Sequence, residues 1–350
     1  YALRRLLITV PLLLAVSLVV FSLANALPGD AAATRFDLHA NPEEMARWRA
    51  ERGLDDPFFV RWGRYVWGVA ARLDFDRSYV DDEPVGHDLV TKLQATLELT
   101  LCAMILGFVV GVTVGILSAV FPRSPIDSVG NVLALAGISM PVFWLGMLLI
   151  VFAVGTLGFA YSSTRYSPDV DVDGFWTHLY LFESFVRLLL SWTREHAGAA
   201  AAASLAVFSS CARNILLPAL ALSTIPMAII TRMTRSAMLE EIDRDYARTA
   251  RAKGLRARAV VLKHVLRNAL IPITTITGLQ FGRLLGGAVL TETVFSWPGL
   301  GRFIVQKGVA SRDTPIIVGG ILLVAATFVI INLVVDLLYA VIDPRVRRGP

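Results

Sequence analysis

Long apolar blocks alternate with polar segments along the chain. A helix that crosses a bilayer needs roughly 20 mostly apolar residues. Six blocks reach that length, at about residues 6–27, 96–121, 129–159, 215–238, 269–291 and 316–342. The third block is longer than one span requires, so we expect it to tilt or to emerge from the bilayer. The pattern therefore predicts an all-α integral membrane protein with about six transmembrane helices.

Two of these blocks allow more than one interpretation. Arg4 and Arg5 precede the first block, and residues 24–26 resemble a signal-peptide cleavage site. The apolar core of a signal peptide has only about 7–15 residues, so we expect an uncleaved first span. In the third block, the Ser139-Met140-Pro141 stretch is either a kink that matters for function or an ordinary packing feature, because membrane helices tolerate proline.

Composition supports a membrane protein and argues against several soluble classes. Charged residues make up 17% of the chain and hydrophobic residues 55%, whereas a soluble globular domain carries about 25% charged residues. Cys102 and Cys211 form no CxxC pair, so we expect neither a disulfide framework nor a metal site. The net charge of +5 is gathered in short segments between apolar blocks, which indicates membrane orientation rather than nucleic-acid binding.

The positions of lysine and arginine predict the orientation of the chain, since short cytoplasmic segments carry an excess of them. Basic residues lie before the first block, after the sixth and, above all, between the fourth and fifth. We name this last segment the basic loop (residues 239–268). With six spans, all three segments fall on one side. We therefore expect a multi-pass protein of the cytoplasmic membrane, with both termini and the basic loop in the cytoplasm.

The two longest polar segments would then lie outside. Residues 28–93 are rich in acids and show helical patterns near 42–52 and 58–73. The second pattern is amphipathic, so we expect it on the membrane surface or against the outer ends of the spans. The second polar segment lies between the third and fourth blocks. We interpret its alanine-rich stretch 197–212 as an outer or interfacial helix, because a further span there would move the basic loop outside.

The basic loop is expected to form two short helices joined by a turn. An acid near the start of residues 243–252 is followed by Tyr246, Ala247 and Ala250. Gly254 suits the end of the first helix, because glycine accepts a left-handed backbone at little cost. A surface that binds anionic lipid loosely is the simpler interpretation. The length of the loop and the small residues along one side of its first helix favour docking of a protein partner.

Several stretches carry a family resemblance: RTARAKGL followed by LRNALIP around the basic loop, RRLLITVPLLLAVSLVVFSLANALPGD, ATLELTLCAMILGFVVGVTVGILSA, ISMPVFWLGMLLI, ETVFSWPGLGRF and NLVVDLLYAVIDPR. They resemble the permeases of ABC transporters, and in particular the first permease subunit of the dipeptide/oligopeptide/nickel subfamily. Aligned on Gly254, only that glycine, Ala250 and Leu266 match the general EAA-loop pattern of such permeases. The resemblance covers nearly the whole chain, but residues 164–213 depart from it.

The resemblance implies a type I ABC importer permease, which forms the path for peptides or nickel across the cytoplasmic membrane. It implies an N-terminal helix with an extracytoplasmic segment (1–94), a permease domain (95–341) that carries the basic loop, and a cytoplasmic tail (342–350). The chain would be a transport subunit and not an enzyme, since it has no GxxxxGK[ST] motif for ATP phosphates.

The resemblance also implies partners. Two separate ATP-binding subunits would use ATP and Mg, while this chain would bind no cofactor. The other expected partners are a second homologous permease subunit, an extracytoplasmic substrate-binding protein and membrane lipid. No nucleic acid is expected. The residues expected to dock an ATPase subunit are Tyr246, Ala247, Thr249, Ala250, Gly254 and Leu255.

Polar residues within the spans are candidates for the translocation path, since ionisable groups in membrane segments are often functional. Arg283 lies in the fifth block and Asp336 in the sixth, with Gln280 and Asn332 nearby at helical spacing. One hypothesis is that they line a water-filled path. The alternative is that they pair with each other, or that Asp336 simply lies near the cytoplasmic face.

Other protein classes compete with an ABC permease. Ion-coupled secondary transporters often show inverted repeats and ion ligands at mid-membrane, and neither is visible here. A membrane-embedded enzyme is disfavoured because the five histidines are scattered, without an HExxH-type cluster. A channel is disfavoured because there is no filter-like loop. The sequence does not distinguish dipeptide, oligopeptide and nickel as substrates.

Overall fold

The computed structural model describes residues 2–26, 32, 35–36, 41–158, 163–168, 170, 172, 175, 177–191 and 198–342, except for the side chains of residues 2–8, 191, 198–200 and 336–342. It divides into two units, which are considered separately. Unit 1 consists of residues 1–96 and 298–330, and unit 2 of residues 97–297 and 331–350. The division of the sequence at residue 94 stays a prediction, since these units follow packing and not the order of the chain.

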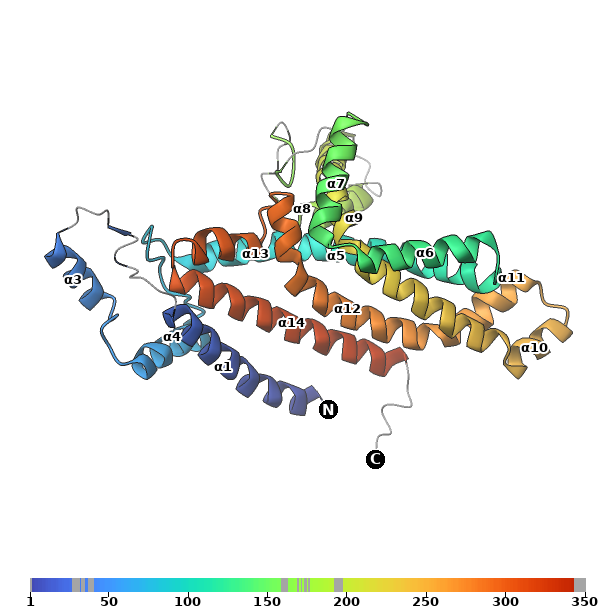
Figure 1. Ribbon diagram of the computed structural model, residues 1–350, viewed down its shortest axis with the longest axis horizontal. Helices are drawn as coiled ribbons and strands as arrows, with labels where there is room; N and C mark the ends of the chain where they lie inside the picture. The colour runs from blue at the N-terminus through green and yellow to red at the C-terminus, as the bar shows by residue number, and fades with distance from the viewer. Residues whose placement is uncertain are drawn as a thin grey trace. The chain divides into compact units, whose positions relative to one another are not determined.

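The described residues form helices and no named strand. The α-helices are labelled in Figure 1, and their bounds are α1 (Ala2–Ala26), α3 (Pro42–Glu51), α4 (Phe58–Arg72), α5 (Val85–Val120), α6 (Pro125–Ser139), α7 (Val142–Gly155), α8 (Tyr180–Ser191), α9 (Gly198–Ile242), α10 (Asp245–Ala252), α11 (Ala257–Ala259), α12 (Leu266–Val294), α13 (Leu300–Phe303) and α14 (Thr314–Ile342). Two π-helical turns complete the set, η1 (Val260–Val265) and η2 (Ile304–Val309).

Apolar helices long enough to cross a membrane account for most of the chain. Five stretches qualify, at Thr9–Ala26, Val85–Val120, Ala201–Ile242, Ala257–Val294 and Thr314–Val335, and the pair α6 and α7 makes a sixth if it counts as one span. The prediction of an all-α membrane protein with about six spans is therefore confirmed. The two predicted helices of the first polar segment are also present, as α3 and α4.

The third predicted span is not one helix. α6 and α7 are bent by 111° relative to each other. Met140 and Pro141 between them are extended, with ψ angles of 130° and 128°. Proline disfavours helical backbone in the residue before it and lacks the amide hydrogen that a continuing helix needs. The expected kink is therefore a complete break, and the tilt expected of a single long helix does not apply.

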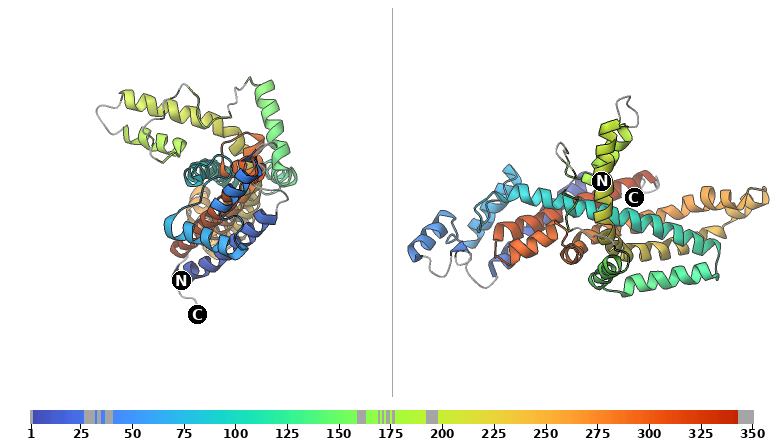
Figure 2. Two further views of the ribbon diagram at one scale, coloured as in Figure 1. Left: turned by 90° about the vertical axis from the view of Figure 1, so that its left-hand side faces the viewer. Right: turned by 90° about the horizontal axis from the view of Figure 1, so that it is seen from above.

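The fourth predicted span is longer than its apolar pattern suggested. Residues 197–212 were expected to form a separate outer or interfacial helix, but from Gly198 onward they are the first part of α9, which continues to Ile242. Pro218 and Pro226 lie inside this helix without ending it. Figure 2 shows the first part of α9 lying beside α8. The fifth span is also extended, since α11, η1 and α12 form one helical run through Pro272.

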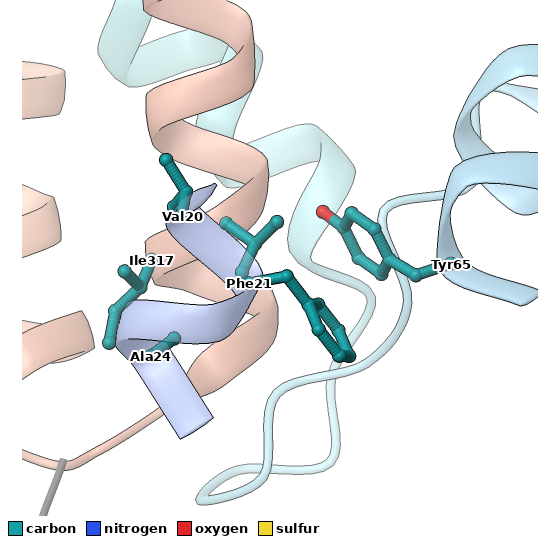
Figure 3. Close-up of a cluster of buried hydrophobic side chains, with 6 residues drawn as sticks. Val20, Phe21, Ala24, Tyr65 and Ile317 are labelled. Atoms are coloured by element: carbon teal, nitrogen blue, oxygen red, sulfur yellow. The ribbon is translucent and has the colours of Figure 1, made fainter. Parts of the chain in front are cut away.

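In unit 1, the amphipathic helix α4 packs on the C-terminal half of α1. Val20, Phe21 and Ala24 of α1 form a buried cluster with Tyr65 of α4 and with Ile317 near the start of α14 (Figure 3). The indole Nε1 of Trp62 donates a hydrogen bond to the hydroxyl oxygen of Ser17, at 3.1 Å. The apolar face of α4 is thus held by two apolar helices, as its periodicity predicts.

A buried carboxylate fixes the start of α14 in unit 1. Asp313 accepts hydrogen bonds from the hydroxyl of Ser78 at 2.6 Å and from the backbone N–H of Tyr79 at 3.0 Å. Its side chain also lies beside the backbone N–H of Ile316, at 3.4 Å. Burial raises the pKa of Asp313, and these hydrogen bonds partly offset that rise.

In unit 2, glycines of α5 allow close packing on α9. A Cβ added at Gly111 would lie 2.9 Å from the carbonyl oxygen of Met227, and one added at Gly115 would lie 2.5 Å from the Cβ of Thr234. Both distances are shorter than van der Waals contact between the atoms involved. The G-x-x-x-G spacing places both glycines on one face, so the two helix backbones approach closely.

Candidate functional site

The basic loop forms one end of unit 2. α10 lies between the end of α9 and the run formed by α11, η1 and α12, at the right-hand end of Figure 1. The predicted helix–turn–helix is present, with one difference. Its second helix does not end before the fifth span begins, because η1 continues directly into α12. The loop is therefore joined to two of the longest apolar helices in the chain.

Small residues of α10 face the chain itself. Ala247 is fully buried and Ala250 is 8% exposed. α10 packs on η1, where Val260 and Val265 are buried as well. The two alanines were expected to let a partner come close. Instead, they let α10 pack closely on η1. A docked partner would therefore depend on these alanines only through the position that they give to α10.

The turn after α10 is a Schellman motif. The backbone N–H of Leu255 donates to the carbonyl of Ala250 at 3.3 Å, and the N–H of Gly254 donates to the carbonyl of Arg251 at 2.9 Å. Gly254 has a φ of +77°, which confirms the expected left-handed cap. The motif satisfies carbonyl groups that the end of the helix would otherwise leave without a donor.

The outward surface of the turn is open and basic. A Cβ added at Gly254 would meet nothing within 4 Å, and Leu255 is 44% exposed. Thr249 is exposed on the same helix. The exposed cations around them are Arg248, Arg251, Lys253, Arg256 and Arg258. Thr249, Gly254 and Leu255 are therefore the predicted docking residues that another protein could touch directly.

Tyr246 joins α10 to the end of α9. Its hydroxyl donates a hydrogen bond to the Glu241 carboxylate. Partial burial raises the pKa of Tyr246, and the bond to Glu241 adds to that rise because it favours the protonated phenol. The side chain is half-buried, so its main contact is within the chain, although part of its surface remains accessible.

The candidate path residues have different surroundings. On α12, Gln280 is 3% exposed, whereas Arg283 is exposed. Asn332 on α14 is half-buried, and the side chain of Asp336 lies outside the described residues. α12 and α14 do meet at this level within unit 2, because a Cβ added at Gly278 would overlap a methyl carbon of Val335.

Arg283 lies on an exposed face of α12. Gly286 and Gly287 are exposed, and a Cβ added at either meets nothing within 4 Å. Leu279 and Leu290 are 54% and 59% exposed. These five residues recur at helical spacing, so they form one stripe. The stripe combines a cation with small residues, and no other described residue lies directly in front of its glycines.

The sequence did not predict a bidentate ion pair at the start of α6. Arg235 of α9 contacts Asp127 twice, with Nε–Oδ1 at 2.7 Å and Nη2–Oδ2 at 2.8 Å. The backbone N–H of Arg123 also donates to Asp127, at 3.0 Å. The N-terminal signal Ser124-Pro125-x-Asp127 indicates a helix start, but it does not identify a partner 108 residues away.

The sequence also did not predict a buried ion pair between Arg165 and Glu98. Arg165 contacts Glu98 of α5, with Nη2–Oε2 at 2.5 Å. Both side chains are buried, at 7% and 2% exposed. The other carboxylate oxygen of Glu98 accepts from the backbone N–H of Leu181 at 2.6 Å, and the Arg165 guanidinium lies 4.6 Å from the ring centre of Tyr180. Arg165, in the segment that departs from the family resemblance, is thereby attached to α5.

Comparison with known families gives two matches that together cover most of the chain. The family described as "Binding-protein-dependent transport system inner membrane component" matches residues 111–348. The family described as "Binding-prot-dependent transport system membrane comp, N-term" matches residues 1–100. The basic loop and both groups of candidate residues lie within the first match.

Curated relatives match over the full length. The dipeptide transport system permease protein DppB of Alkalihalophilus pseudofirmus is 42% identical over 347 residues, covering 99% of each chain. DppB of Escherichia coli strain K12 is 41% identical over 351 residues, covering 99% of this chain and 98% of the relative. The glutathione transport system permease protein GsiC of Salmonella paratyphi A is 38% identical over 347 residues, with coverage of 99% and 98%.

Proposed function

The chain belongs to the family of inner membrane components of binding-protein-dependent transport systems, and we propose that it carries peptides inward across the cytoplasmic membrane. It is a permease subunit of an ABC importer and a transport protein rather than an enzyme. Dipeptide and glutathione transport, in the names of its relatives, support a peptide cargo over nickel. An ion-coupled secondary transporter is not favoured.

The proposed assembly contains three kinds of protein partner. Two ATP-binding subunits use ATP and Mg, a second homologous permease subunit completes the path, and an extracytoplasmic binding protein delivers the peptide. The family description, which names a binding-protein-dependent system, supports the last of these. Both termini and the basic loop lie in the cytoplasm in this proposal, as the positive-inside pattern predicts.

The outward surface of the basic loop is the observation that carries the coupling role. Thr249, Gly254 and Leu255 are exposed beside a turn whose backbone is fixed by its own hydrogen bonds. A fixed and exposed surface is what a docking partner needs, because little conformational entropy is lost on binding. We assign direct contact with an ATPase subunit to these three residues, and the positioning of α10 to Tyr246, Ala247 and Ala250.

The exposed stripe on α12 is the best candidate for the translocation path. Arg283 is exposed on a helix of a candidate span. A charged side chain within a span needs water or a polar partner. We propose that Arg283 faces the path in the assembled importer and that Gln280, Asn332 and Asp336 lie near it.

The docking assignment can be tested by adding bulk at Gly254. The Gly254→Trp side chain would meet open space in this chain, so it should clash only with a docked partner. We expect uptake of a labelled dipeptide to fall at least about tenfold, which corresponds to about 1.4 kcal/mol. Uptake would be measured in cells that lack their own permease and produce all partner subunits, with the amount of permease in the membrane determined in parallel.

Two further variants separate bulk from backbone strain. Any residue with a Cβ at Gly254 incurs about 1–2 kcal/mol for its left-handed backbone, so Gly254→Ala measures that cost alone. Gly158→Trp is a matched control, because Gly158 also has a positive φ, at +61°, and nothing within 4 Å of its Cβ position. Normal uptake by Gly254→Trp, or equal loss in Gly158→Trp, would refute the docking assignment.

A further inference from the structure

A cavity lined by arginines lies in unit 1 beside α4. Its volume is about 380 Å³, and all of its lining residues belong to unit 1. The charged residues in its wall are four arginines and two aspartates: Arg52, Arg61, Arg64, Arg72, Asp74 and Asp76. Asp82 and Asp56, which lie outside the lining, pair with Arg52 and Arg64, so the capacity of the wall to bind an anion rests on Arg61 and Arg72.

The arginines of the cavity differ in how far they are already neutralised. Arg64 contacts Asp56 at 2.6 Å, and Arg52 is bonded to Asp82. Arg61 instead lies 5.8 Å from the ring centre of Phe21 and is hydrogen-bonded to Tyr79, which carries no negative charge. Arg72 is exposed and has no acidic partner among the residues that the structure describes. Arg61 and Arg72 are thus the cations with most capacity to bind an added anion.

The cavity lies at the end of two candidate membrane spans. Phe21 is near the end of the span Thr9–Ala26, while Thr314 and Pro315 begin the span Thr314–Val335, and all three line the cavity. Trp67 of α4 lines it too and is 68% exposed. Tryptophan is enriched where membrane proteins meet the polar headgroups. Figure 3 shows Tyr65 of α4 directed toward the end of α1. The cavity therefore lies beside the ends of two candidate spans, where lipid headgroups are expected.

We propose that this cavity binds the phosphate group of an anionic phospholipid such as phosphatidylglycerol. Guanidinium groups donate paired N–H bonds that match the geometry of phosphate oxygens. Free inorganic phosphate offers the same oxygens. The exposed indole and the apolar helix ends favour the lipid, since its glycerol and acyl chains would lie against them.

The proposal can be tested by native mass spectrometry of the assembled transporter in detergent. Phosphatidylglycerol or zwitterionic phosphatidylethanolamine would be added, and bound lipid counted. We expect preferential retention of phosphatidylglycerol. The double variant Arg61→Gln/Arg72→Gln should weaken retention of one phosphatidylglycerol about 30-fold, the effect of two arginines near a membrane surface. Arg72→Gln alone changes an exposed residue and should weaken it by a smaller factor.

Control measurements distinguish this site from other basic surfaces. Arg47→Gln removes an exposed arginine of α3 that does not line the cavity, so it should leave lipid retention unchanged. Lipid bound to the basic loop would be retained equally in all variants. Equal retention of the two lipids, or unchanged retention in the double variant, would overturn the proposal. Displacement of the lipid by inorganic phosphate at similar concentration would assign the cavity to free phosphate and overturn the lipid assignment.

Discussion

The contact between α5 and α9 allows a stability prediction with a built-in control. In Gly115→Ala, the new methyl carbon would lie 2.5 Å from the Cβ of Thr234 and 2.8 Å from the carbonyl oxygen of Thr231. Carbon atoms pack best at about 3.5–4.0 Å, so the two helices must separate by roughly 1 Å. Strain of this kind typically costs about 1–3 kcal/mol. At about 2–4 °C for each kcal/mol, the unfolding temperature should fall by about 2–12 °C.

Two cysteines make this unfolding directly measurable. Cys102 on α5 and Cys211 on α9 are free thiols, and Cys211 is buried. A maleimide dye that fluoresces on reaction would therefore report the separation of these two helices during heating of the purified protein. The variant Gly286→Ala makes the same covalent change on α12, where the new methyl group meets nothing within 4 Å. If Gly115→Ala and Gly286→Ala unfold at the same temperature, close packing of α5 on α9 does not limit stability and the reasoning is wrong.

Two further predictions concern buried carboxylates. Glu98→Gln leaves Arg165 as an uncompensated buried charge, so it should cost about 3–5 kcal/mol and lower the unfolding temperature; equal instability of the double variant Glu98→Gln/Arg165→Met would contradict this. Burial raises the pKa of Asp313, so this carboxyl group binds a proton more tightly in the folded protein than in the unfolded chain. Its contribution to the free energy of unfolding is therefore full below the ordinary carboxyl pKa of about 4 and is lost as pH rises through the raised pKa. Unfolding temperatures recorded from acidic to neutral pH should show this component in the unmodified protein, and its persistence in Asp313→Asn would refute the assignment.

Hydropathy and backbone chemistry account for the parts of the fold that were predicted correctly. A run of about 20 apolar residues suits only a small set of structures, so most of the spans could be located without knowing their neighbours. Gly254 could be assigned to a left-handed cap because the requirement is local. The break at Met140-Pro141 is local too, but proline shows only that a helix is disturbed, and its neighbours decide whether the result is a kink or a bend of 111°.

The parts that were missed depend on contacts between distant residues. Periodicity placed Ala247 and Ala250 on one face of α10 correctly, but it could not show that this face meets η1 rather than a partner. Glu98 and Arg165 are 67 residues apart, and nothing in the composition of either segment signals the pair. The continuity of α9 was missed for a related reason. An alanine-rich helix is only weakly apolar, so hydropathy ended the span where the most apolar residues end.

Under the proposed function, the connections of the basic loop explain how docking at its surface could act on Arg283, the candidate path residue. α10 is held against η1 by the buried Ala247 and Ala250, so α10 cannot shift alone without opening a void in close-packed structure. η1 continues into α12, where Arg283 is exposed, and Arg235 joins α9 to α6 about two turns before α9 ends. A docked subunit that displaces α10 therefore acts on three helices of unit 2 together. The connection from α10 to α12 passes through the π-helical turn η1, and such turns recur at functional positions. Under the proposed function, movement of α10 should consequently change the exposure of Arg283 more than that of the buried Gln280 on the same helix.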